Sequence, residues 1–160
     1  MPRPGPEDRY DWRVQCRLAA ALQRSEPDVM VYVPSAFHQE GASSEIEFYG
    51  ERLRAEGIPE VALRLEQRGL ETVEQCELAT ALAVAHGARL VVISCYAHFP
   101  RVRYLMNGYT VEHVVAWGTP SAWLQLTHVV LQWGFPVIDK LGLRQAWKDR
   151  VARRRKEGKQ

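Results

Sequence analysis

The sequence lacks a continuous hydrophobic run of about 20 residues, the length that a membrane-spanning helix needs. An uncharged stretch at residues 114–138 is interrupted by two glycines, two prolines and two glutamines. Residues 1–11 contain charges and prolines but no apolar run, so they do not resemble a secretory signal peptide. We therefore expect a cytoplasmic protein without a transmembrane helix.

Cysteine is scarce, and its spacing fits neither a disulfide framework nor a zinc site. The three residues are Cys16, Cys76 and Cys95, an odd number without any Cys-x-x-Cys pair. Free thiols are typical of a reducing compartment, which again favours the cytoplasm. This pattern predicts no metal site.

Internal repeats and low-complexity segments are also absent, and the length suits a single domain spanning residues 1–160. The formal charge is uneven, because residues 144–160 hold eight Lys or Arg against two acids while the whole chain carries only +2. A basic C-terminal helix from about residue 143 could make weak contacts with anionic lipid. Cations that suit the end of a helix are the structural alternative. Nucleic-acid binding is not favoured, because no aromatic residues are interleaved among the arginines of the tail.

What the sequence does contain is an alternation of strand-like and helical segments. Four strands are predicted from short apolar runs at residues 29–33, 60–65, 90–94 and 113–117. The predicted helices cover residues 11–24, 44–57, 72–87, 100–108, 119–133 and 143 onward. This alternation is typical of right-handed crossovers between parallel strands. We therefore predict an α/β fold, a Rossmann-like three-layer sandwich with a mainly parallel sheet of about four strands.

Two of these helices begin with a capping-box pattern. Ser44 is followed by Glu47, and Thr72 is followed by Gln75. In a capping box, a Ser or Thr side chain accepts a hydrogen bond from the backbone N–H three residues later, and the side chain of that later residue accepts one from the backbone N–H of the Ser or Thr. Gly87 is expected to end the second of these helices.

Polar side chains gather in the loops that follow the predicted strands, where open parallel sheets bind their ligands. The candidate ligand-binding residues are Ser35, Ser44, Thr72, Ser94 and Arg101. The candidate catalytic residues are His98, Glu45 and Glu71. Two helix N-termini, together with an arginine that could bind bidentately, suit an anionic group such as phosphate. We predict that Glu45, Thr72, His98 and Arg101 converge on one concave pocket at the carboxyl edge of the sheet.

Each candidate also has a structural alternative. His98 could act as an acid or base, since a histidine has an ordinary pKa of about 6.5, but it could equally be a surface histidine. Arg101 could form an ion pair with Glu71 or Glu74 instead of binding a ligand. Carboxylates in a first helical turn, such as Glu45, also stabilise the helix dipole.

Three segments, in this order, resemble the motifs of the YdcF-like family. They are Ser44-Glu45, then Glu66 followed by residues 71–75, and then residues 94–101. The resemblance covers residues 29–105, roughly half of the chain. It implies a Rossmann-like fold and a small, nucleotide-like ligand, with a nucleotide or adenosylmethionine as the candidate cofactor. It implies no particular reaction, and some members of the family are linked to cell-envelope metabolism.

Two functional hypotheses follow. In the first, an enzyme acts on a phosphorylated or nucleotide-like small molecule, with His98 as acid or base and Arg101 as anion clamp. In the second, a non-catalytic module only binds such a ligand. A pocket in which His98 faces Glu45 or Glu71 would favour the enzyme. A cleft whose carboxylates are engaged in helix capping would favour the binding module.

Overall fold

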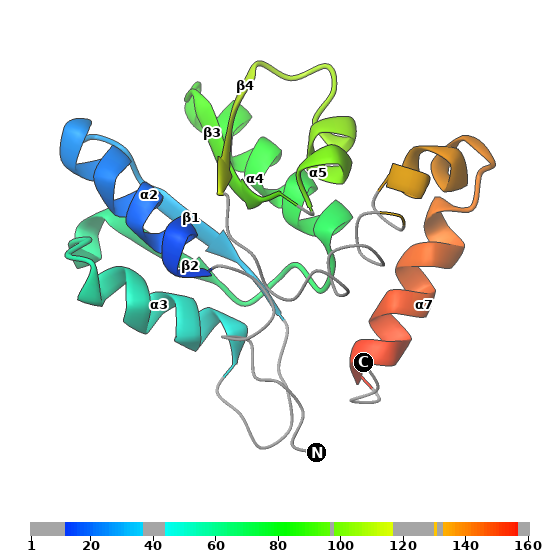
Figure 1. The fold of residues 1–160 in the computed structure, drawn as a ribbon, viewed down its shortest axis with the longest axis horizontal. Coiled ribbons are helices and arrows are strands. Elements are labelled where there is room, and N and C mark those ends of the chain that lie inside the picture. Colours follow the sequence, from blue (N-terminus) through cyan, green and yellow to red (C-terminus); the bar gives the residue numbers. More distant parts are fainter. Residues whose placement is uncertain (1–11, 37–43, 97, 117–129, 131–132, 157–160) are drawn as a thin grey trace.

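The computed structural model describes residues 12–36, 44–96, 98–116, 130 and 133–156 (Figure 1). The helices are α2 (Trp12–Ser25), α3 (Glu45–Ala55), α4 (Thr72–His86), α5 (Phe99–Leu105) and α7 (Arg144–Lys156). The strands are β1 (Val31–Pro34), β2 (Leu63–Glu66), β3 (Leu90–Cys95) and β4 (Val111–Ala116). Residues 133–140 are also helical. The predicted α/β class is confirmed.

All four strands pair in parallel, but they form two separate sheets. In the first, β1 runs beside β2 with Val31 opposite Leu63. In the second, β3 runs beside β4 with Leu90 opposite Val111. Within the described ranges, no strand pairing joins the two sheets, so the predicted three-layer sandwich with a single sheet of about four strands is not confirmed. Strand pairing depends on contacts between distant parts of the chain, which local sequence patterns do not specify.

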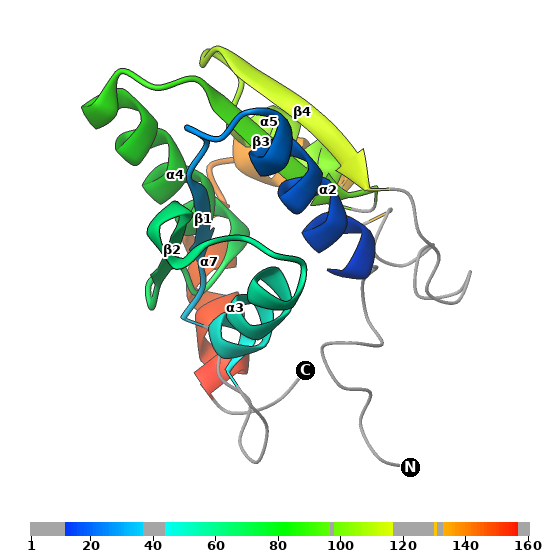
Figure 2. The ribbon, with the colours of Figure 1, turned by 90° about the vertical axis from the view of Figure 1, so that its left-hand side faces the viewer.

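Helices lie on both sides of the strands (Figure 2). α2 contacts α3 and both strands of the second sheet, while α4 contacts α5, β1 and β3. The larger core joins α2 to α3 through Trp12, Cys16, Phe48 and Leu53. Trp12 and Phe48 meet edge to face, with ring centroids 5.0 Å apart. A smaller core joins α4 to α5 around Val102 and neighbouring side chains.

The two predicted capping boxes have different outcomes. The box at α3 is confirmed, because the Glu47 N–H donates to Ser44 Oγ at 3.2 Å and the Ser44 N–H donates to Glu47 Oε2 at 2.9 Å. The prediction of a capping box at α4 is wrong. Thr72 is already helical, and Glu71 is the capping residue. Gln75 instead donates its side-chain amide to the Gly69 carbonyl.

Several boundaries shift by a few residues. The expected strand at residues 60–65 begins with a 3-10 turn at Glu60–Ala62, and β2 follows it. β4 begins at Val111, two residues earlier than expected. The predicted helix at residues 119–133 falls almost wholly outside the described residues. No helix in the part of the chain that the structure describes is long and apolar enough to cross a membrane.

Candidate functional site

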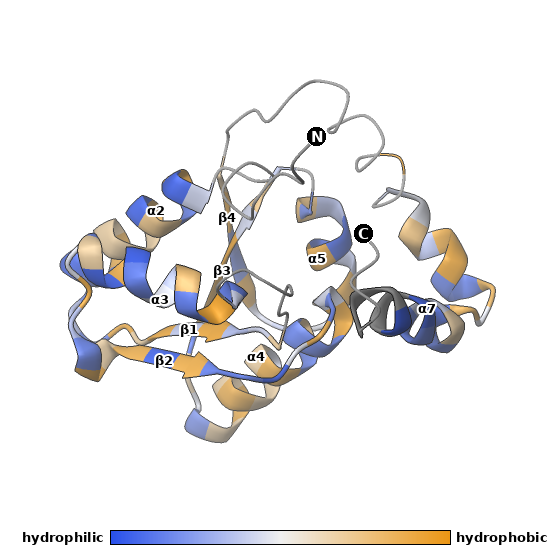
Figure 3. Cartoon of the chain, turned by 90° about the horizontal axis from the view of Figure 1, so that it is seen from below, coloured by the Kyte–Doolittle hydropathy of each residue, from blue (hydrophilic) through white to orange (hydrophobic). Residues whose placement is uncertain are grey.

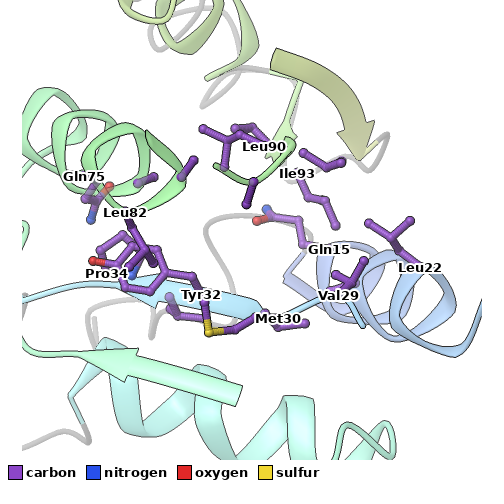
Figure 4. Close-up of a pocket in the computed structure, with 18 of the residues that line it drawn as sticks. Gln15, Leu22, Val29, Met30, Tyr32, Pro34, Gln75, Leu82, Leu90 and Ile93 are labelled. Carbon is purple, nitrogen blue, oxygen red and sulfur yellow. The ribbon is translucent and has the colours of Figure 1, made fainter. Parts of the chain in front are cut away.

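A cavity of about 920 Å³ lies between the two sheets. Figure 4 shows β1 below it with Tyr32 and Pro34, and β3 above it with Leu90 and Ile93. α4 and α2 close the two sides, and Leu82 lies on the α4 side. The middle of the cavity is therefore apolar.

The helical walls of the cavity follow a simple spacing. α4 contributes its residues at positions 72, 75, 76, 79, 82, 83 and 86, which share one face of a helix. α2 contributes Gln15, Cys16, Ala19 and Leu22 in the same way. This spacing was visible in the sequence, but periodicity alone does not distinguish a cavity wall from a packed core.

Three of the predicted site residues line the cavity, at the places where β1 ends and where α3 and α4 begin. Ser35 follows β1, Glu45 is the first residue of α3, and Thr72 is the first residue of α4, and all three line the cavity. Ser35 Oγ donates a hydrogen bond of 2.6 Å to Glu45 Oε2. The Ser35 backbone N–H donates to the Glu66 carbonyl at 2.9 Å, which fixes this end of β1 to β2. We call Ser35, Glu45 and Thr72 the polar end of the cavity.

Glu71 and Arg101 form a separate buried pair. Arg101 Nη2 lies 2.8 Å from Glu71 Oε2, and the two side chains are only 5% and 4% exposed. The Glu71 carboxylate also accepts hydrogen bonds from the Val73 and Glu74 backbone N–H groups at 3.0 and 2.9 Å. Glu71 therefore provides acceptors for the free backbone N–H groups at the start of α4, and Arg101 balances its charge. Neither residue lines the cavity.

Arg101 is held by aromatic rings as well. Its guanidinium lies 4.3 Å from the centroid of Phe135 and 5.8 Å from that of Trp147. Arg101 belongs to α5, Phe135 to the helical residues 133–140 and Trp147 to α7, so this stack joins α5 to the C-terminal helices. Phe135 is fully buried. Cation–π contacts of this kind strengthen when they are shielded from water.

The remaining candidates lie apart from the cavity lining. Ser44 uses its side chain to cap α3. His98 is the N-cap of α5, and its side chain makes no capping hydrogen bond there. Ser94 lies near the carboxyl end of β3, is 6% exposed, and has no hydrogen-bond partner for its hydroxyl among the described residues. Of the four residues predicted to converge on one pocket, Glu45 and Thr72 line the cavity, whereas His98 and Arg101 do not.

Two cysteines line the cavity, and neither is a plausible nucleophile. Burial raises the pKa of Cys16 to about 11 and the pKa of Cys76 to about 12. Both thiols therefore stay protonated near neutral pH, where only a thiolate would attack. Tyr32 is similar: burial and its hydrogen bond to Glu66 raise its pKa to about 12.

No group of three or more metal-ligating side chains occurs within the described ranges. No family model, no curated protein and no solved structure matches the chain. The case for a function therefore depends on the geometry of the cavity.

Proposed function

We propose that this chain binds a nucleotide-like small molecule in the cavity between β1 and β3. The observation that carries the proposal is a cavity of about 920 Å³ with an apolar middle and a polar end where Ser35 follows β1, while Glu26, Asp28 and Arg89 also contribute to its lining. Small-molecule sites typically have volumes of about 300–1,000 Å³ and combine an apolar lining with a few oriented polar groups. A flat, largely apolar base fits between the strands, and a polar sugar fits beside Ser35 and Glu45.

The charge at the polar end favours the sugar over a phosphate. Glu45 is an acceptor that suits ribose hydroxyls, a role that acidic residues play in nucleotide-binding α/β folds. Arg101, a buried cation near the start of α4, is already neutralised by Glu71. We therefore expect a neutral or cationic ligand, such as a nucleoside or adenosylmethionine, to bind more tightly than free phosphate.

Non-catalytic binding is the form of the proposal that the side chains support best. Glu71 is engaged in capping and in its ion pair, and His98 does not line the cavity. General acid–base catalysis needs a titratable group within hydrogen-bond reach of the reacting atoms. Of the described acids that line the cavity, Glu45 lies at the polar end, and Glu26 and Asp28 precede β1.

Catalysis on a phosphorylated substrate is the second candidate, and Ser94 favours it. A buried hydroxyl without a partner at the carboxyl end of a strand suits a ligand contact, and Ser94 lies four residues before His98. In this alternative, Arg101 would exchange Glu71 for the substrate anion. Hydrolysis of a simple phosphate monoester that is lost in the variant His98→Gln would support catalysis over simple binding.

The proposal also includes a Rossmann-like arrangement and a cytoplasmic location. The pair β1-β2 lines one side of the cavity and β3 of the pair β3-β4 lines the other, which suits a doubly wound arrangement with its ligand between the two pairs. All three cysteines are free and buried, which suits a reducing compartment.

Native mass spectrometry of freshly purified protein tests the proposal first, because it would retain and identify a bound small molecule. Isothermal titration with adenosine, adenosylmethionine and inorganic phosphate then compares the ligand classes. We expect adenosine or adenosylmethionine to bind and phosphate to bind more weakly. Phosphate binding that exceeds nucleoside binding would contradict the assignment of the polar end.

A further inference from the structure

An apolar stripe lies on the outer face of the helix that precedes α7. It consists of Val130, Trp133, Val137 and Leu141, which are between 60% and 67% exposed. The four-residue spacing places Trp133 and Val137 on one face of the helix at residues 133–140. Leu141 lies in the turn that follows, where its backbone N–H donates to the Val137 carbonyl at 3.1 Å, and Val130 is a described helical residue three positions before Trp133. Figure 3 shows hydrophobic colouring on this helix beside the hydrophilic α7.

The stripe is held in this position by the opposite face of the same helix. Phe135 is fully buried and stacks edge to face against Tyr104 and Trp147. Asp139 accepts a hydrogen bond of 2.8 Å from the Tyr104 hydroxyl and also pairs with Arg144. Since the inner face is anchored by these contacts, the outer apolar side chains cannot turn inward without breaking them.

Exposed basic residues lie at the end of the stripe and follow it along the chain. Lys140, Arg150 and Arg153 are exposed. α7 contains seven Lys or Arg residues against one Asp. An apolar face that includes tryptophan, with cations beside it, is the composition of helices that lie in the headgroup region of a bilayer.

We propose that this face docks the protein reversibly on an anionic membrane surface. The stripe buries its side chains among the lipid headgroups, and the basic residues of α7 pair with the lipid phosphates and carboxylates. A symmetric dimer through this face would instead bring the basic residues of the two copies together. Such a contact costs free energy by like-charge repulsion. Few apolar side chains are involved, so the attachment is weak and sensitive to salt.

Vesicle co-sedimentation of the full chain tests this docking. We expect binding to vesicles of phosphatidylcholine mixed with phosphatidylserine, and much weaker binding to phosphatidylcholine alone.

The double variant Val137→Ser with Leu141→Ser should weaken binding by about tenfold or more. The matched control Val84→Ser replaces a similarly exposed valine on α4 and should bind like the parent. Reversing Arg150 and Arg153 to glutamate should weaken binding by about tenfold or more.

Tryptophan fluorescence adds a readout at the stripe itself. The emission should shift to shorter wavelength on adding the anionic vesicles, and the shift should be largely lost in Trp133→Phe. Unchanged circular dichroism and melting temperature would show that the variants are folded. Absence of vesicle binding, or binding that the stripe variants do not weaken, would overturn the proposal. So would a dimer, formed without vesicles, that the stripe variants dissociate.

Discussion

α3 and α4 begin in similar ways, but their first glutamates lie in different surroundings. Glu45 of α3 is half-buried, accepts a hydrogen bond from Ser35 and lines the cavity. Glu71, just before α4, is 3% exposed and is bound by two backbone N–H groups and by Arg101. The first carboxylate therefore faces the cavity of the proposed ligand, whereas the second is engaged within the fold.

The difference follows from which group caps each helix. At α3 the short Ser44 side chain caps, so Glu45 points elsewhere and reaches the cavity. At α4 no Ser or Thr occupies the capping position, so the Glu71 carboxylate folds back onto the helix start. A carboxylate that is buried in this way needs a cation, and Arg101 supplies it.

The largest expected effect is on the buried pair. Arg101→Ala leaves the Glu71 carboxylate without its cation and should lower the free energy of unfolding by about 3–5 kcal/mol. Arg54→Ala is the matched control, because it removes a pair with Glu60 that is exposed to solvent, and stability should hardly change. Urea unfolding measures both. Equal losses in the two variants would show that the Glu71–Arg101 pair does not stabilise the start of α4.

The next effect separates ligand binding from stability. Glu45→Gln keeps the volume and the acceptor for Ser35 but removes the charge, so affinity for adenosine should fall about tenfold, since a hydrogen bond to a charged group contributes about 1.5–3 kcal/mol. Stability should change by less than about 1 kcal/mol. Glu47→Gln is the control, because it lies in the same helical turn and serves the capping box. Titration calorimetry would contradict the assignment if both variants bound adenosine like the parent.

A smaller effect distinguishes the two caps. Ser44→Ala should destabilise the protein by about 1 kcal/mol, because it removes a side-chain cap. Thr72→Ala should cost about 0.5 kcal/mol or less, because Glu71 rather than Thr72 caps α4. Thermal unfolding of the two variants checks this order. The reverse order would mean that the cap of α4 is assigned to the wrong residue.

The smallest expected effect is a pH dependence of the protein's stability that comes from Cys76, on the α4 side of the cavity. Burial raises the pKa of the Cys76 thiol from 9.0 to about 12. The unfolded chain therefore loses this proton at a lower pH than the folded protein, and stability should fall as pH rises from 9 toward 12. Cys76→Ala should make that fall shallower when unfolding is followed by urea titration at several pH values. An identical slope in parent and variant would exclude a contribution from Cys76.

Local features of this fold could be predicted from the sequence, and contacts between distant residues could not. The Ser44 cap, Gly87 at the end of α4 and the strand at residues 90–95 follow from neighbouring residues, and all three are present. Glu71 and Thr72 both fit a capping position, so the pattern alone could not choose between them. The separation of β1 from β3 depends on long-range pairing, which no local pattern specifies.

The candidate site shows the same limit. Ser35, Glu45 and Thr72 line the cavity, and they occupy a strand end and two helix starts, which periodicity can locate. Arg101 could equally bind a ligand or a carboxylate, because the chemistry of its guanidinium is the same in both cases. Its burial beside Phe135 depends on the C-terminal segment, whose position no local pattern encodes.

Filling the cavity is the most direct test that the ligand lies between the two sheets. Ala79 lines the cavity, whereas Ala81 is exposed on the same helix. Leucine has almost the helix propensity of alanine, so Ala79→Leu and Ala81→Leu differ mainly in where the added side chain projects. Calorimetric titration with adenosine should show binding to Ala81→Leu as to the parent, and strongly weakened binding to Ala79→Leu. Equal adenosine binding by all three proteins would contradict the placement of the ligand in this cavity.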